Sequence, residues 1–286
     1  MKTLEDIKTI AVIGAGTMGS GIAQLAAAAG YKTIIYDLNE QALDNACKAI
    51  DKNLQGALDR GKLSMADKEN IFRNISTTTE VSQLQADVII EAVVEKLEVK
   101  HDIFRKLMRI NDEDTILATN TSSIPITQIA YGIPNPGRVV GMHFFNPAHI
   151  MKLVEVISGA ATDEQVAQTI KLLAEKMGKK AVMAKDAPGF IVNRVARHYY
   201  VEGLKILEEN VADVETIDAL MEASGFKMGP FRLMDLIGVD TNFDVTSSIY
   251  NQFQQDGKFR PNRIQKQKVD AGFHGRKTGK GFYSYQ

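Results

Sequence analysis

The chain has 286 residues, enough for two domains that each bury a core, and 44% of its residues are hydrophobic. The formal net charge of −1 gives no overall field for nucleic acid or a membrane surface, although a local basic patch for an acidic substrate is compatible with it. We predict no disulfide framework and no metal site, because Cys47 is the only cysteine and the histidines lack metal-ligand spacing. We also predict a cytoplasmic location, because no apolar stretch reaches the length of a membrane span.

The first predicted strand, residues 9–13, ends in a glycine-rich turn, and an alanine-rich helical pattern follows. In such a unit Gly14 permits the tight bend, Gly16 lets a pyrophosphate approach the backbone, and Gly19 lets the helix lie close to the sheet. Unpaired N–H groups and the dipole at the helix N-terminus then bind the anion. The segment therefore predicts a dinucleotide site, whose turn consists of Gly14, Ala15, Gly16, Thr17, Met18 and Gly19.

A second strand, residues 32–36, ends in Asp37, at about the spacing where a carboxylate accepts hydrogen bonds from an adenosine ribose. The alternative is that Asp37 only helps to cap the next helix through Asn39. Neither Leu38 nor Asn39 supplies a positive charge for a 2′-phosphate, which a carboxylate would repel. We therefore predict NAD rather than NADP as the cofactor.

Strand and helix patterns alternate over the first two thirds of the chain, which predicts a parallel sheet with helices on both faces. The segment at about 39–74 is too long for a minimal crossover, and its apolar spacing predicts a helical hairpin that projects from the domain. A helix at 163–177 and a closing strand at 180–184 complete this part. The remaining strands are predicted at 87–92, 115–119, 138–143 and 153–157.

From Pro188 onward the pattern becomes helical, and the boundary falls within residues 186–189. The predicted fold class is α/β, with a Rossmann-type dinucleotide-binding domain, residues 1–186, followed by a smaller all-α domain, residues 187–286. Large apolar faces predict a homodimer formed through the second domain, and the alternative is a monomeric bundle in which these faces close on each other. The second domain is predicted to contain helices at 190–209, 213–224, 234–253 and 261–271 and a β-type run at 281–285.

His143 and Glu155 are the candidates for proton transfer. His143 follows a β-type run, at the edge where open α/β sheets bind ligands, and an imidazole can take up and return a proton near neutral pH. Glu155 interrupts an apolar strand, and a buried carboxylate needs a partner. A His–Glu pair would fix the tautomer of the imidazole and stabilise its protonated form. The alternatives are a hydrogen-bonded core histidine and a glutamate that faces water.

Two further polar residues could contact a substrate. Ser122 follows the strand at 115–119 and could bond a substrate oxygen or merely cap the next helix. Asn193 lies early in the first helix of the second domain, where it could reach a cleft or make a hydrogen bond between the domains. From the residues alone both alternatives stay open.

Several distinctive motifs stand in order along the chain, at residues 14–19, 91–95, 120–123, 143–147, 151–156, 188–194, 229–230, 235 and 275–283. Together they resemble the 3-hydroxyacyl-CoA dehydrogenases, especially the short 3-hydroxybutyryl-CoA type, over essentially the whole chain. The resemblance implies oxidation of an L-3-hydroxyacyl-CoA to the 3-ketoacyl-CoA with NAD, or the reverse reduction. It also implies that His143 is the catalytic base, that Glu155 orients it, and that Ser122 and Asn193 bond the reacting oxygen of the acyl-CoA.

The resemblance implies cofactor contacts as well, at Asp37, Glu95, Lys100, Asn120, Ser122, Asn146 and Lys277. Coenzyme A contacts in this family come from the helical projection, where this chain has Asn53 and Arg60 in place of the expected Ser and Lys. A second departure is the sequence Ala-His-Ile at residues 148–150, where many members carry a Pro-Val-type sequence. No fused hydratase domain is expected, so only the dehydrogenase step is predicted.

Two other functions are alternatives. A dehydrogenase of a small hydroxy acid or sugar acid would use the same fold, but Lys52, Arg60 and Lys62 on the projection favour a phosphorylated coenzyme A tail. The other alternative is a non-catalytic NAD-binding protein on the same scaffold, like the crystallin relatives of this family. The joint presence of the four residues assigned to catalysis argues against it.

Overall fold

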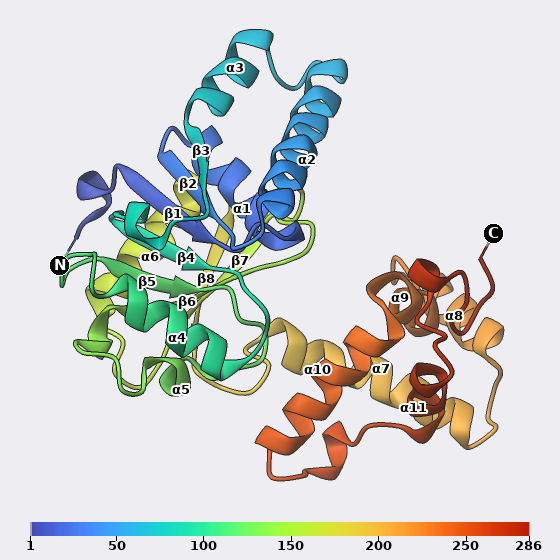
Figure 1. The fold of residues 1–286 in the computed structure, drawn as a ribbon. Coiled ribbons are helices and arrows are strands. Elements are labelled where there is room, and N and C mark those ends of the chain that lie inside the picture. Colours follow the sequence, from blue (N-terminus) through green and yellow to red (C-terminus); the bar gives the residue numbers. More distant parts are fainter. Residues whose placement is uncertain (1, 286) are drawn as a thin grey trace. The chain divides into compact units, whose positions relative to one another are not determined.

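The computed structural model describes residues 2–285. The chain forms two compact units, one up to Ala187 and one from Pro188 onward (Figure 1). The division lies one residue after the predicted boundary. Within residues 2–285, no helix is both long and apolar enough to cross a membrane.

The first unit contains an eight-stranded sheet with the strand order β3-β2-β1-β4-β5-β6-β7-β8. The strands from β3 to β6 are parallel, in the order of a Rossmann fold, which confirms the predicted fold class. The strands are β1 (Thr9–Ile13), β2 (Lys32–Tyr36), β3 (Ile75–Thr78), β4 (Val88–Glu91), β5 (Ile116–Thr119), β6 (Val139–Phe144), β7 (Leu153–Ser158) and β8 (Lys180–Lys185).

The sheet differs from the prediction in two respects. β7 runs antiparallel to β6, whereas the sequence pattern predicts a wholly parallel sheet. Only residues 145–152 connect these two strands, and a parallel return needs a crossover of about a dozen or more residues. β3 is not among the predicted strands, because its sequence Ile-Ser-Thr-Thr has no apolar run and it lies at the edge of the sheet.

Helices cover both faces of the sheet (Figure 1). α1 and α6 pack into the core on one face. α4 and α5 contact each other, and α5 packs against β6 on the other face. The helices of this unit are α1 (Thr17–Ala28), α2 (Glu40–Asp59), α3 (Met65–Arg73), α4 (Leu97–Leu107), α5 (Ile126–Ala130) and α6 (Glu164–Lys176).

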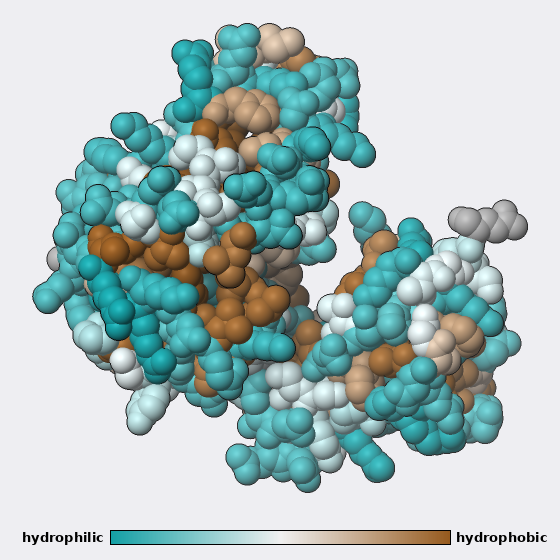
Figure 2. Space-filling view, viewed as in Figure 1, coloured by the Kyte–Doolittle hydropathy of each residue, from teal (hydrophilic) through white to brown (hydrophobic). Residues whose placement is uncertain are grey.

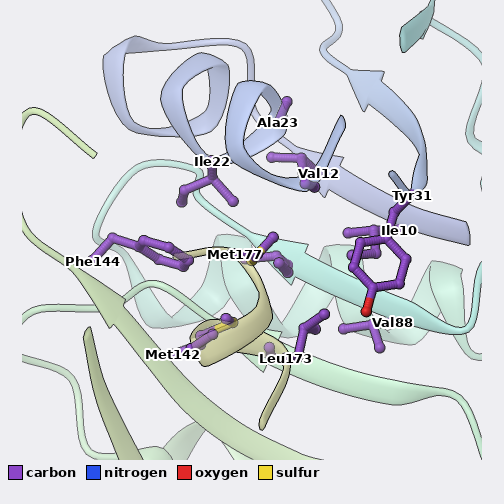
Figure 3. Packing of buried hydrophobic residues seen from close by; sticks show 14 of the residues in the cluster. Ile10, Val12, Ile22, Ala23, Tyr31, Val88, Met142, Phe144, Leu173 and Met177 are labelled. Atoms are coloured by element: carbon purple, nitrogen blue, oxygen red, sulfur yellow. The ribbon is translucent and has the colours of Figure 1, made fainter. Parts of the chain in front are cut away.

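Strand side chains alternate between the two faces, and this alternation places the candidate residues. Met142 and Phe144 of β6 belong to the core under α1 and α6, and Figure 3 shows them close to Ile22 and Leu173. Burial of a side chain such as Ile22 contributes about 1.5–3 kcal/mol, so this face of each strand is strongly specified. His143, between Met142 and Phe144, therefore faces the side of α5.

α2 and α3 form a helical hairpin over the segment predicted to project from the domain (Figure 1). The side chain of Asn39 caps α2 by accepting a hydrogen bond from Gln41 N. Ser64 and Asp67 form a capping box at the start of α3. The buried face of α2 has the spacing of one helix face and consists of Leu43, Ala46, Ile50 and Leu54.

The second unit is helical, as predicted for a smaller all-α domain. The prediction of a single helix at 234–253 is wrong. Gly238 has a φ of 107°, outside the helical region, and separates two helices there. The helices are α7 (Val192–Glu208), α8 (Val214–Ala223), α9 (Pro230–Ile237), α10 (Val239–Gln252) and α11 (Arg263–Asp270).

The β-type run at 281–285 does not form a strand. Next to it Lys280 makes only isolated bridges, and the buried carboxylate of Asp235 in α9 accepts hydrogen bonds from Phe282 N and Tyr283 N, each at 2.9 Å. A side chain, and not a neighbouring strand, thus satisfies these backbone groups.

Candidate active site

The glycine-rich turn between β1 and α1 has the geometry of a dinucleotide site. Gly14 has a φ of 103°, which favours glycine, and a Cβ there would lie 2.7 Å from Ala92 O. A Cβ on Gly19 would lie 1.7 Å from Gly14 O, so only glycine lets α1 approach the turn. Nothing lies within 4 Å of where a Cβ on Gly16 would be, which leaves the start of α1 open to an anion.

A cavity of about 530 Å³ adjoins this turn, and Asp37 lines it. Oδ2 of Asp37 accepts a hydrogen bond from Ala15 N at 2.8 Å, and Oδ1 accepts one from Asn39 N at 3.0 Å. The carboxylate therefore holds the turn as well as bordering the cavity. Figure 2 shows hydrophobic residues gathered on the surface of this unit. Leu38 and Val94, 83% and 60% exposed, give the cavity apolar walls on which a planar ring could lie.

His143 of β6 and Glu155 of β7 stand directly opposite each other in the antiparallel register. His143 Nδ1 lies 2.8 Å from Glu155 Oε2, and both side chains are almost completely buried. An ionised carboxylate can only accept, so Nδ1 donates its hydrogen to Glu155 and Nε2 is left for proton exchange. Glu155 does not face water, because its side chain is completely buried. The ring of Phe145 lies 4.6 Å from the imidazole, centroid to centroid.

The loop after β5, residues 120–124, carries Ser122, and a carboxylate from another segment holds it. Glu95 Oε1 accepts hydrogen bonds from Ser122 N at 2.8 Å, from Ser123 N at 3.0 Å and from Thr121 Oγ1 at 2.6 Å. The N-cap residue of α5 is Pro125, and no side chain caps this helix. Ser122 is therefore not a helix cap. Burial raises the pKa of Glu95, but Lys100, Thr121 and the N–H of Ser122 lower it more, and the pKa lies below its usual value.

Lys100 is buried beneath this loop, with 1% of its side chain exposed. Its Nζ lies 2.7 and 2.9 Å from the two carboxylate oxygens of Glu91 and 3.2 Å from Glu95 Oε2. Three acceptors match the three N–H groups of an ammonium. A contact of Lys100 with the cofactor, which the resemblance implies, stays a prediction.

Glu91 is a site residue that sequence reasoning named only as part of a motif. It ends the apolar run Val-Ile-Ile-Glu of β4, and its side chain is completely buried. A carboxylate at the end of an otherwise apolar central strand needs a partner, and that was the signal available in the sequence.

The other predicted cofactor residues of the first unit lie near the same strand ends. Asn120 Oδ1 accepts a hydrogen bond from Phe144 N at 2.8 Å and ties the end of β5 to the end of β6. Asn146 is exposed in the loop after β6. Thr17 and Met18 form the first turn of α1.

The predicted coenzyme A contacts lie on α2. Asn53 donates a hydrogen bond to Gln24 Oε1 at 3.1 Å, and Arg60 is exposed at the end of the helix. The other predicted residues belong to the second unit: Asn193 lies in the first turn of α7, and Lys277 donates to Asp240 Oδ2 at 2.6 Å. In the described chain, no three His, Cys, Asp or Glu side chains are placed to hold a metal ion.

The loop at residues 148–150 is anchored by Lys179. Its Nζ donates hydrogen bonds to Ala148 O at 2.6 Å and to Met151 O at 2.8 Å. Burial lowers the pKa of Lys179, and burial together with the charge of Lys179 lowers the pKa of His149. The buried Lys179 ammonium therefore fixes the loop at residues 148–150, whose sequence departs from the one expected for the family.

Comparison with known families adds the decisive observation. The NAD-binding domain of the 3-hydroxyacyl-CoA dehydrogenases matches residues 9–187, and the C-terminal domain of the same family matches residues 189–285. The chain belongs to the 3-hydroxyacyl-CoA dehydrogenase family. It is an NAD-dependent oxidoreductase, and the predicted family, enzyme class and cofactor are confirmed.

Individual relatives agree with the family assignment. A 3-hydroxyadipyl-CoA dehydrogenase of Escherichia coli (strain K12) is 47% identical over 98% of this chain, which spans only 60% of that protein. A probable 3-hydroxybutyryl-CoA dehydrogenase of Bacillus subtilis (strain 168) is 43% identical, and the match covers 98% of each chain. The solved structure of an (S)-3-hydroxybutyryl-CoA dehydrogenase from Ralstonia eutropha has a TM-score of 0.94 at 36% identity, covering 98% of this chain and 99% of that one.

Proposed function

We propose that this enzyme oxidises short L-3-hydroxyacyl-CoA thioesters, 3-hydroxybutyryl-CoA above all, to the 3-ketoacyl-CoA with NAD, or catalyses the reverse reduction. The observation that carries the proposal is the buried His143–Glu155 pair, on the unit that also holds the glycine turn and the Ser122 loop. The names of the relatives, which include 3-hydroxybutyryl-CoA and 3-hydroxyadipyl-CoA, support an acyl-CoA substrate.

His143 and Glu155 account for the proton. Oxidation removes a proton from the 3-hydroxyl and a hydride from C3, and Nε2 of His143 takes the proton because Nδ1 is bonded to Glu155. The buried carboxylate then stabilises the imidazolium that forms, and in reduction the imidazolium returns the proton to the oxygen. When bound, NAD accepts the hydride, and the open cradle at Gly16 and the cavity beside Asp37 fit its pyrophosphate and adenosine.

Ser122 is proposed to bond the reacting oxygen. Ser122 Oγ lies 3.3 Å from Glu95 Oε1, farther than the two backbone N–H groups that bond the same oxygen. The hydroxyl can therefore turn to a substrate oxygen while the backbone stays in place. A donor fixed where negative charge develops stabilises the transition state.

Chain-length preference tests the finer part of the proposal. We expect the highest kcat/KM for NADH-dependent reduction with acetoacetyl-CoA, and lower values as the ketoacyl chain lengthens. The same series run with the dicarboxylic 3-ketoadipyl-CoA separates the two substrate names found among the relatives. A steady rise of kcat/KM with chain length, or a strong preference for the dicarboxylic thioester, would contradict 3-hydroxybutyryl-CoA as the main substrate.

NAD is expected to be used in preference to NADP, because Asp37 borders the cavity and Leu38 follows it without a positive charge. Placing a 2′-phosphate beside a carboxylate costs several kcal/mol, so kcat/KM for NADH should exceed that for NADPH by about 10²-fold or more. The substitution Asp37→Ser, which keeps a hydrogen-bonding group, should lower the ratio of kcat/KM for NADH to kcat/KM for NADPH. Similar kcat/KM values for the two cofactors in the unmodified enzyme would contradict the role of Asp37.

Arg60 and Lys62 are expected to contact the phosphates of coenzyme A, because both are positively charged and exposed in the projection. Exposed charge contacts contribute about 0.2–1 kcal/mol each, so Arg60→Gln/Lys62→Gln should raise KM for acetoacetyl-CoA by about two- to thirtyfold at low salt. The control Lys8→Gln/Lys32→Gln removes the same charge at the amino ends of β1 and β2. An unchanged KM at every ionic strength would exclude this role.

We also propose that the chain forms a homodimer through the helices of the second unit. Large apolar side chains there are exposed on α7, α8 and α9, among them Val195 at 69% and Leu220 at 65%. Burying such side chains against a second copy would remove them from water. Sedimentation at assay concentrations should give the mass of a dimer, and a compact monomer would overturn the proposal.

A further inference from the structure

A chain of charged groups, of which Glu91 and Lys100 are buried, connects the end of β4 to the Ser122 loop. We infer that Glu91 is a positioning residue for Ser122, acting through Lys100 and Glu95. The inference rests on the proposed contact of Ser122 with the substrate. It assigns to Glu91 and Lys100 the task of fixing where the Ser122 hydroxyl lies.

Glu91 is the fixed end of this chain of contacts. It is the last residue of β4, and its carboxylate accepts hydrogen bonds from Val93 N at 2.7 Å, from Thr119 Oγ1 at 2.6 Å and from Lys100 Nζ at 2.7 and 2.9 Å. These contacts fill the roughly four acceptor positions of a carboxylate. The donors come from the turn after β4, from β5 and from α4, so the carboxylate is held in a single orientation.

Lys100 transmits this orientation. Two of its N–H groups point at Glu91 and the third points at Glu95 Oε2, 3.2 Å away, so the ammonium bridges the two carboxylates. Its side chain is 1% exposed, so these carboxylates and not water set the position of the ammonium. Displacement of Glu91 would therefore change the position of the ammonium and, with it, the position of Glu95.

Glu95 is the member that touches the loop. Its side chain is 35% exposed, so without Lys100 it could rotate into water. With Oε2 held by Lys100, Oε1 is aimed at the backbone N–H groups of Ser122 and Ser123 and fixes the loop at both. A displacement of about 1 Å at a reacting group can cost on the order of 10²-fold in rate, so this support is expected to matter for turnover.

The test measures the single-turnover rate of NADH oxidation by acetoacetyl-CoA. Glu91→Gln should lower this rate by about 10²-fold and leave the Kd for NADH, measured by fluorescence titration, within about threefold of the unmodified value. The double variant Glu91→Gln/Ser122→Ala should be no more than about threefold slower than Ser122→Ala, because residues that act through one another are not additive.

A milder pair of variants covers the case in which Glu91→Gln does not fold. Thr119→Val deletes one donor to Glu91 and should slow turnover by about tenfold, and Thr119→Ser should restore the rate. Thr115→Val is the matched control, because Thr115 is a buried threonine beside the opposite end of β5 whose hydroxyl donates to Ala86 O. The control should stay within about twofold of the unmodified rate.

The outcomes separate this inference from the proposed function. A native rate for Ser122→Ala contradicts the proposed contact of Ser122 with the substrate, and the inference falls with it. A slow Ser122→Ala enzyme combined with losses that multiply in the double variant, or with equal rates for Thr119→Val and Thr115→Val, overturns the inference alone. A raised Kd for NADH in Glu91→Gln would instead make the cluster part of the cofactor site and would also overturn it.

Discussion

His143→Ala is expected to lower kcat for acetoacetyl-CoA reduction by about 10²–10⁴-fold, the loss that removal of a general acid or base produces. The imidazole is the group held by Glu155 at the sheet edge, and alanine leaves nothing there to exchange a proton with the reacting oxygen. NADH binding should persist, because the glycine turn and the cavity beside Asp37 do not include this residue. Initial rates and an NADH titration on the same preparation check both expectations.

His101→Ala is the matched control for that variant. His101 lies on α4 of the same unit and bonds Gln128 O, outside the proposed site. It should keep kcat within about twofold of the native value. A His143→Ala enzyme that is as active as the His101→Ala control would show that another residue handles the proton.

Glu155→Gln is expected to lower kcat more than it raises KM. Replacing the orienting carboxylate of a histidine base by an amide lowers kcat by up to about 10⁴-fold. The amide can still touch Nδ1, but it carries no charge to stabilise the imidazolium and it does not fix the tautomer. The acidic limb of the pH profile for oxidation should move to lower pH, because the negative charge that favours the protonated ring is gone.

A double variant with both substitutions shows whether His143 and Glu155 act as one functional unit. His143→Ala/Glu155→Gln should be little slower than His143→Ala alone, because Glu155 has no role once the imidazole is absent. Losses that multiply in the double variant would mean that Glu155 contributes independently. A native kcat and pH profile for Glu155→Gln would mean that the buried contact is structural.

Local patterns in the sequence predict the glycine-rich turn after β1. Gly14 and Gly19 allow close backbone approaches within a short strand-turn-helix segment, and Gly16 leaves open space at the start of α1. His143 and Glu155 were also accessible, because a buried carboxylate in an apolar strand requires a partner. Their contact depends on the antiparallel pairing of β6 and β7, whereas the alternation of strands and helices predicts a parallel sheet.

The remaining features depend on tertiary structure that local patterns do not contain. Glu91 ends β4, Glu95 lies in the loop that follows, and Lys100 lies on α4, so their contacts depend on the path of this connection. The predicted contact of Lys100 with the cofactor rests on the resemblance alone. The break between α9 and α10 was missed because an apolar helical pattern continues across Gly238, whose positive φ ends the first helix.

The most direct test of the central claim is the rate of NADH oxidation with acetoacetyl-CoA compared with free acetoacetate at equal concentrations. The proposed function predicts rapid turnover of the thioester, formation of L-3-hydroxybutyryl-CoA, and little or no turnover of the free acid. Turnover of the free acid with no reaction of the thioester would contradict the assignment of an acyl-CoA substrate to the His143–Glu155 site.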